Sequence, residues 1–254
     1  MKVLERGFIF KKVDITEKEK VNYYIKELNL DELDSLMTLQ NEIHQDIPDK
    51  YKETYVCKPK KEFEKYLKNG GIFLGIYVNN KLIGARITQT PKLSKKNLGC
   101  FLNFNKEQLL KTMHFKTMLV KKEFRGNNLQ IRSMNLVEKM FIKKGYKYGL
   151  CRISPNNYYS LSNALKFGLK IEAIKLQFQN KENTSSKLRC ILNKKLDATQ
   201  PITFEEIEYV KNTNIERQLE LLENNYVGFK AKNFNTIDDF TIVYGKDIHK
   251  KIIT

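Results

Sequence analysis

The segment from Met113 to Ile153 constrains the fold more than any other part of the chain. "MHFKTMLV" alternates in the manner of a strand, "YGLCRI" reads as a second strand, and the helix expected between them, over residues 129–144, carries an apolar face made of Leu136, Val137, Met140 and Phe141. A strand, a helix and a strand in this order predict a parallel strand pair joined by a crossover helix. The chain is therefore expected to belong to the α/β or α+β class.

The remaining segments complete this picture. Strands are expected within residues 8–30, helices over about 33–44 and 59–70, a hairpin turning at Asn79 and Asn80, and a closing hairpin over 170–196. Past residue 197, Thr203/Glu206 and Thr213/Glu216 have capping-box spacing, which predicts two short helices before an antiparallel ribbon. We expect an N-terminal strand extension over 1–21, a main domain over 22–197 and a C-terminal subdomain over 198–254.

Length and composition favour a cytoplasmic protein. The chain has 254 residues, of which 41% are hydrophobic, enough for one large domain with a small appendage. Its beginning is broken by charge every few residues, so no signal peptide is expected, and "IFLGIYV" is too short to span a membrane. The four cysteines have neither CxxC nor Cys/His spacing, which predicts reduced thiols and no metal site.

The net charge of +17 raises the question of a nucleic-acid partner. Most of the excess is Lys rather than Arg, and few basic clusters are flanked by aromatic residues, so the sequence disfavours nucleic acid and favours a compositional origin. The charge is unevenly spread: residues 111–150 hold ten Lys or Arg against two acids, a local +8, whereas residues 198–254 carry −2. The positive charge gathers around one turn.

That turn is "EFRGNNLQ", between the strand ending at Val120 and the helix beginning near Leu129. A glycine-containing turn that opens a helix exposes unpaired main-chain N–H groups at the positive end of the helix dipole. It therefore predicts an anion site. A lone Arg-Gly pair is a weak signal, but a second motif, "PNNYYS" at Pro155–Ser160, follows about thirty residues later and leads into a helix that ends at Gly168-Leu169.

Together the two motifs resemble those of the GNAT acetyltransferase superfamily. The family's central motif has the form V-x-P-x-x-R-G-x-G-x-G/A, and some bacterial members carry R-G-N-G-L-Q, which this chain matches as R-G-N-N-L-Q from Arg125 to Gln130. The second family motif resembles P-x-N-x-x-S/A. Asn128 stands where the family usually has glycine. Asparagine tolerates the left-handed conformation, but its side chain narrows the approach of a phosphate.

The resemblance implies a fold and a cosubstrate. It implies a mixed, strongly twisted sheet of about seven strands flanked by about four helices, and acetyl-CoA as cosubstrate without a metal. The strand at Met118, Leu119 and Val120 would pair with the pantetheine arm, and Asn157 and Ser160 of the second motif would also contact the cosubstrate. The pyrophosphate would be held by the amides of the turn, namely Arg125, Gly126, Asn127, Asn128, Leu129 and Gln130.

The catalytic groups are less clear from the sequence. An amine with a pKa of about 10.4 costs about 4.6 kcal/mol to deprotonate at pH 7, whereas expelling a thiolate costs only about 2 kcal/mol, so a base matters more than an acid. The family's usual acid is a tyrosine seven residues after the motif asparagine, where this chain has Ala164. Tyr158 and Tyr159 are substitute candidates. His114, six residues before Val120 and on the same face if the strand alternates regularly, is the candidate base.

The sequence therefore predicts an N-acetyltransferase that acts on a primary amine of a small molecule or peptide. The acceptor pocket would form from the first two helices and the loop over 91–108, where Asp46 and Asp49 could attract a cationic amine. Two alternatives stay open: a CoA-binding regulator with little catalysis, suggested by Ala164, and a basic module that binds RNA or the ribosome. A monomer or a homodimer is expected, with no membrane association.

Overall fold

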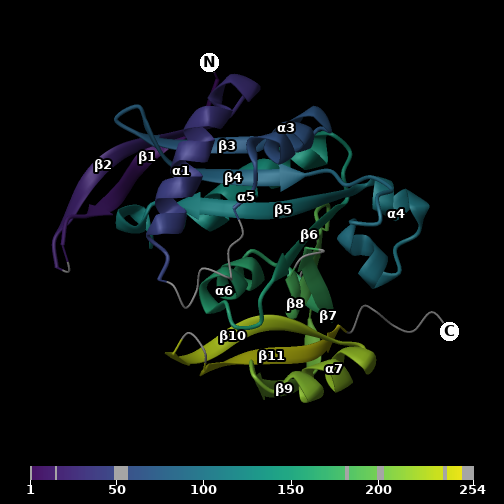
Figure 1. Cartoon of the computed structure of the whole chain (residues 1–254). Coiled ribbons are helices and arrows are strands. Elements are labelled where there is room, and N and C mark those ends of the chain that lie inside the picture. The colour runs from purple at the N-terminus through teal and green to yellow at the C-terminus, as the bar shows by residue number, and fades with distance from the viewer. Residues whose placement is uncertain are drawn as a thin grey trace. The chain divides into compact units, whose positions relative to one another are not determined.

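A computed structural model describes residues 2–14, 16–48, 57–180, 183–198, 203–236 and 239–247. The chain divides into two units, one formed by Met1–Pro91 with Met113–Phe141 and the other by Lys92–Thr112 with Ile142–Thr254. Eleven strands and six α-helices lie within the described residues, which confirms the mixed class and exceeds the predicted number of strands (Figure 1).

The sheet of the first unit is antiparallel, in the order β1-β2-β3-β4-β5. Its strands are β1 (Val3–Lys12), β2 (Lys18–Glu27), β3 (Phe73–Val78), β4 (Lys81–Gln89) and β5 (Thr112–Val120). The predicted turn at Asn79 and Asn80 is confirmed. Both residues adopt positive φ, 48° and 59°, as the two central residues of a type I′ hairpin turn do.

Two helices cover one face of this sheet, α1 (Leu33–Gln45), preceded by η1 (Leu30–Glu32), and α3 (Lys60–Lys68) (Figure 1). The core between them and the sheet consists of Leu28, Leu33, Leu36, Leu39, Ile43, Phe63, Tyr66, Phe73, Tyr77, Ala85, Ile87 and Leu119. The opposite face packs against α5 (Leu129–Lys143), where Ser133 Oγ lies 3.5 Å from Met118 Sδ. Each helix was expected near its observed position from the spacing of its apolar residues.

The second unit has its own strand order, β6-β8-β7-β10-β11-β9. These strands are β6 (Tyr148–Ile153), β7 (Lys170–Asn180), β8 (Asn183–Lys195), β9 (Phe204–Lys211), β10 (Tyr226–Thr236) and β11 (Asp239–Asp247). The accompanying helices are η2 (Leu98–Leu102), α4 (Lys106–Leu110), α6 (Tyr158–Lys166) and α7 (Ile215–Glu223). One core cluster joins Leu98 to Leu150, Ala173 and Ile191 of three strands.

One predicted element in the C-terminal region is wrong. Residues from Thr203 were expected to begin a helix, but Phe204–Lys211 forms β9, which pairs with β11 along its length. Pairing with a distant strand overrides the capping-box spacing, and the stacking of Phe204 on Phe229, with ring centroids 4.1 Å apart, adds to it. The second predicted helix exists as α7, although Asn214 rather than Thr213 caps it.

The N- and C-terminal segments both pair with strands of the predicted main domain. β1 pairs with β2, and β10 pairs with β7 through Gly228 and Ile171, so the segments predicted as an extension and a subdomain continue the neighbouring strands. Asp49 lies outside the described residues. No helix in the described part of the chain is long and apolar enough to cross a bilayer.

Candidate functional site

The turn between β5 and α5 is built by two left-handed residues. After β5 the chain forms the short helix η3 (Lys122–Phe124) and then an extended residue, Arg125. Gly126 follows with φ of +92°, and Asn128 has φ of +55°. The first angle strongly favours glycine, and the second is one that asparagine adopts at little cost, as the sequence predicted.

The inner side of this turn is bare main chain. A Cβ built on Gly126 would meet no atom within 4 Å. The bond from Arg132 N to Asn128 O, 3.0 Å long, belongs to the start of the hydrogen-bond pattern of α5, so the first turn of this helix faces the open space at Gly126. The first turn also holds no acidic residue. Open space and the positive helix end together fit a diphosphate.

The side chain of Asn127 connects the turn to β1. Its Oδ1 accepts a 2.8 Å hydrogen bond from Phe10 N, while its Nδ2 donates to Phe10 O at 2.7 Å and to Phe124 O at 2.9 Å. The side chain therefore pairs with the outer edge of β1 as a neighbouring strand would. The predicted contact of the Asn127 main-chain amide with the cosubstrate stays a prediction.

Two arginines donate hydrogen bonds to main-chain carbonyl groups of the same region. Arg125 Nε donates to Val120 O at 3.2 Å, so this guanidinium holds the end of β5 against the turn. Arg86 on β4 is only 3% exposed and donates to Gln130 O at 3.1 Å and to Ser133 Oγ at 3.2 Å. A buried cation beneath the first turn of α5 adds to the positive potential there.

Two lysines that precede the turn form ion pairs with acidic residues in the last part of α1 and directly after it. Lys121 pairs with Glu42 at 2.6 Å and Lys122 with Asp46 at 3.6 Å. Asp46, which the sequence offered as an attractor for a cationic amine, thus already has a cationic partner. These pairs also hold the end of α1 close to η3.

The predicted pantetheine strand is ordered by β4. Met118, Leu119 and Val120 lie opposite Arg86, Ala85 and Gly84 of β4. Gly84 is required there, since a Cβ built on it would approach the Leu119 carbonyl oxygen to 2.9 Å. Contact of these residues with the cosubstrate stays a prediction.

His114 lies on a different face from the one expected. Ile87 pairs with Thr117 and the next residue of β4, Thr88, pairs with Phe115, so Lys116 is an extra residue that forms a bulge in β5. The bulge reverses the alternation. His114, opposite Gln89, consequently shares the face of Leu119 that α1 covers, whereas Val120 points to the other face. The expectation that His114 and Val120 share a face is wrong for this reason.

The second motif lies in the other unit, at the start of α6. Asn157 caps this helix by accepting a 3.1 Å hydrogen bond from Ser160 N. Tyr158 packs in an aromatic cluster, with its ring 4.3 Å from Phe234 and 5.1 Å from Phe240, while Tyr159 is exposed. The cosubstrate contacts of Asn157 and Ser160 and the acid role of the two tyrosines remain predictions.

Ala164 is buried on the inner side of α6, at the position where the family usually has its acid. Within the described residues, no three His, Cys, Asp or Glu side chains form a group that could hold a metal ion.

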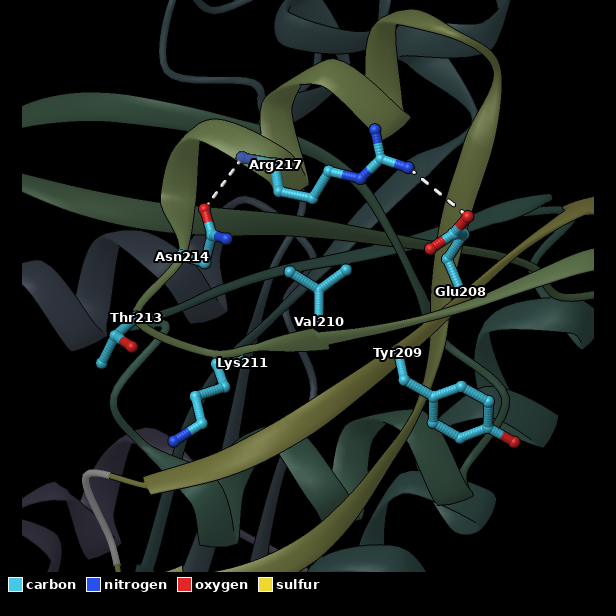
Figure 2. A pocket seen from close by; sticks show the side chains of 7 residues that line it. All are labelled: Glu208, Tyr209, Val210, Lys211, Thr213, Asn214 and Arg217. Carbon is cyan, nitrogen blue, oxygen red and sulfur yellow. Dashed lines mark hydrogen bonds and ion pairs between the residues drawn. The ribbon is translucent and has the colours of Figure 1, made fainter.

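A surface hollow of the second unit lies between β9 and the start of α7 (Figure 2). Among its lining residues, Arg217 pairs with Glu208 at 3.4 Å and with Glu220 at 2.7 Å. Asn214 at its rim accepts a bond from the Arg217 amide and so caps α7. Since these polar groups serve the local structure, the hollow offers no reactive constellation.

Comparison with known proteins agrees with the fold. No family model matches the sequence, and no curated protein matches it. Solved structures do match. An N-acetyltransferase from Staphylococcus aureus Mu50 aligns with a TM-score of 0.51 and 16% identity, covering 69% of this chain and 99% of that one. The acetyltransferase of the GNAT family from Streptococcus pneumoniae aligns with a TM-score of 0.51 and 12% identity, covering 68% of this chain and 99% of that one.

A third match is yncA, a putative acetyltransferase from Salmonella typhimurium solved with acetyl-CoA, with a TM-score of 0.51, 11% identity, and coverage of 70% and 97%. At these identities the likeness concerns the fold. The chain has the fold of the GNAT acetyltransferases.

Proposed function

We propose that this chain is an acetyl-CoA-dependent N-acetyltransferase whose acceptor is a primary amine of a small molecule or peptide. The observation that carries the proposal is the open turn at Gly126, where two residues in the left-handed conformation precede α5. A GNAT-type fold raises the expectation of acetyl transfer, and a protein of this fold has been solved with acetyl-CoA.

In this proposal the main chain of the turn contacts the diphosphate, and neighbouring side chains hold the turn in place. The main chain from Arg125 to Gln130 would hold the diphosphate, with Asn127 and Arg86 fixing the turn through Phe10 and Gln130. The cosubstrate supplies an activated acetyl thioester. In the overall reaction the amine nitrogen forms a bond to the acetyl carbon, the carbon–sulfur bond breaks, and one proton passes from nitrogen to sulfur.

Calorimetry with acetyl-CoA tests directly whether the turn at Gly126 holds the diphosphate. Replacing Gly126 by Leu fills the open space above the turn and should weaken acetyl-CoA binding at least tenfold. Gly70 is the matched control, because its φ of +95° imposes the same backbone penalty, about 1–2 kcal/mol for a side chain, away from the turn. Gly70→Leu should therefore lose stability but keep its affinity. Unchanged affinity in Gly126→Leu would remove the turn from the site.

A thiol-release assay across small amines, amino acids, aminoglycosides and peptides then tests turnover. Release that depends on one class of amine supports the enzyme and names its acceptor. Tight acetyl-CoA binding without turnover on any amine would instead indicate the CoA-binding regulator suggested by Ala164.

A further inference from the structure

The ribbon formed by β1 and β2 separates its charges between its two faces. On one face, four cross-strand pairs follow one another: Arg6 with Tyr24, Phe8 with Asn22, Phe10 with Lys20, and Lys12 with Lys18. This face holds four cations and no acid. The alternate residues place Glu5 and Glu19 on the other face, with Lys11. We call the first set the aromatic–basic face.

The two phenylalanines of this face are unusually exposed. Phe8 is 59% and Phe10 51% exposed, although Ile9 between them is buried on the opposite face. Lys20 Nζ lies 4.2 Å from the Phe8 ring centroid, so a cation already approaches this ring. Figure 1 shows the ribbon extending past α1, which covers the neighbouring strands. Exposed rings framed by cations present stacking surfaces beside sites for phosphate.

We propose that the aromatic–basic face binds single-stranded nucleic acid, independently of the acetyl-transfer function. Its bases would stack on Phe8 and Phe10, and its phosphates would lie near Arg6, Lys12, Lys18 and Lys20. A duplex is excluded as the preferred ligand because its base faces are covered by their neighbours. Only strand pairing brings the full set together, since Lys18 and Lys20 come from β2, whereas both rings, Arg6 and Lys12 come from β1.

Two other ligands with partly similar chemistry fit less well. An anionic membrane would meet the tip of the ribbon, where Asp14 and Glu17 are both exposed. Hydrogen bonds from the Glu17 and Thr16 amides lower the pKa of Asp14, so this carboxylate is charged at neutral pH. The adenine nucleotide of CoA offers one base, whereas the face has two rings and spans from Arg6 to Lys12, about 20 Å along an extended strand.

Fluorescence anisotropy with the full chain tests the proposal, using a labelled oligo-U of about 12 nucleotides, a length within the range of single-strand sites. The double variant Phe8→Ala/Phe10→Ala should bind at least tenfold more weakly. Leu176→Ala, at a residue 62% exposed on β7, is the matched control for loss of an exposed apolar side chain and should bind as the parent does. Urea unfolding of each variant checks that the fold is retained.

Salt dependence tests the cations. Lys18→Ala/Lys20→Ala should reduce the slope of log K against log salt by about 1.4, as expected for two lost phosphate contacts on a single strand. Lys95→Ala/Lys96→Ala, in an exposed loop elsewhere, should leave the slope unchanged. Four results would overturn the proposal: equal affinity for a duplex, no effect of the phenylalanine variant, binding only to phosphatidylserine vesicles, or displacement of the oligonucleotide by equimolar CoA.

Discussion

Replacing Asn127 should loosen the turn more when the new side chain is aspartate than when it is alanine. Alanine removes three hydrogen bonds, of 2.8 and 2.7 Å to Phe10 and 2.9 Å to Phe124 O. Two of the three are exposed, so water replaces them in part, and the expected loss is about 1–2 kcal/mol of the free energy of unfolding.

Aspartate is nearly the same size but has the wrong hydrogen-bonding groups. One of its oxygens can still accept from Phe10 N, while the other faces the carbonyl oxygens of Phe10 and Phe124 with no proton to share. Two lost bonds and the added repulsion predict a loss of about 2–3 kcal/mol. The new negative charge would also oppose a diphosphate, so acetyl-CoA affinity should fall further in Asn127→Asp than in Asn127→Ala.

Urea unfolding and calorimetry measure the two effects separately. Asn22→Ala, an exposed asparagine on β2, is the control and should change the free energy of unfolding by less than about 0.5 kcal/mol. If Asn127→Asp unfolds at the parent urea concentration, the bonds to Phe10 contribute nothing in solution. The account of β1 as a support for the turn would then fail.

Two further predictions concern single titratable groups. Burial alone would raise the pKa of Glu32, but hydrogen bonds from Lys26 and Tyr77 lower it below its ordinary value, so its stabilising charge is present at neutral pH and is lost as the pH falls through the folded pKa. Urea unfolding should find the parent more stable than Glu32→Gln by about 1 kcal/mol at pH 7, and this difference should shrink as the pH falls below the ordinary pKa range of glutamate. His114→Gln should lower the acetylation rate without changing acetyl-CoA affinity; an equal rate in steady-state kinetics would end its candidacy as base.

The turn could be anticipated from the sequence because its signals are local. Gly126 and Asn128 are residue types that adopt positive φ, and they stand directly before the apolar periodicity of α5. Such features depend on a few adjacent residues and need no knowledge of the rest of the fold. The same holds for the Asn79-Asn80 hairpin.

Features that depend on a partner strand could not be anticipated. The bulge at Lys116 exists only relative to β4, and it moves His114 to the other face of the sheet. The contact of Asn127 with Phe10 joins residues separated by 117 positions. β9 was misread because pairing with β11, rather than its own propensity, decides its conformation.

Phe10 shows how one strand residue can serve two separate roles. Its main-chain groups point along the plane of the sheet, where Asn127 binds them, while its side chain stands perpendicular to that plane on the aromatic–basic face. Truncating the ring therefore leaves the support of the turn intact, and changing Asn127 leaves the rings in place. Because each change spares the other feature, nucleic-acid binding and acetyl-CoA binding can be disproved one at a time.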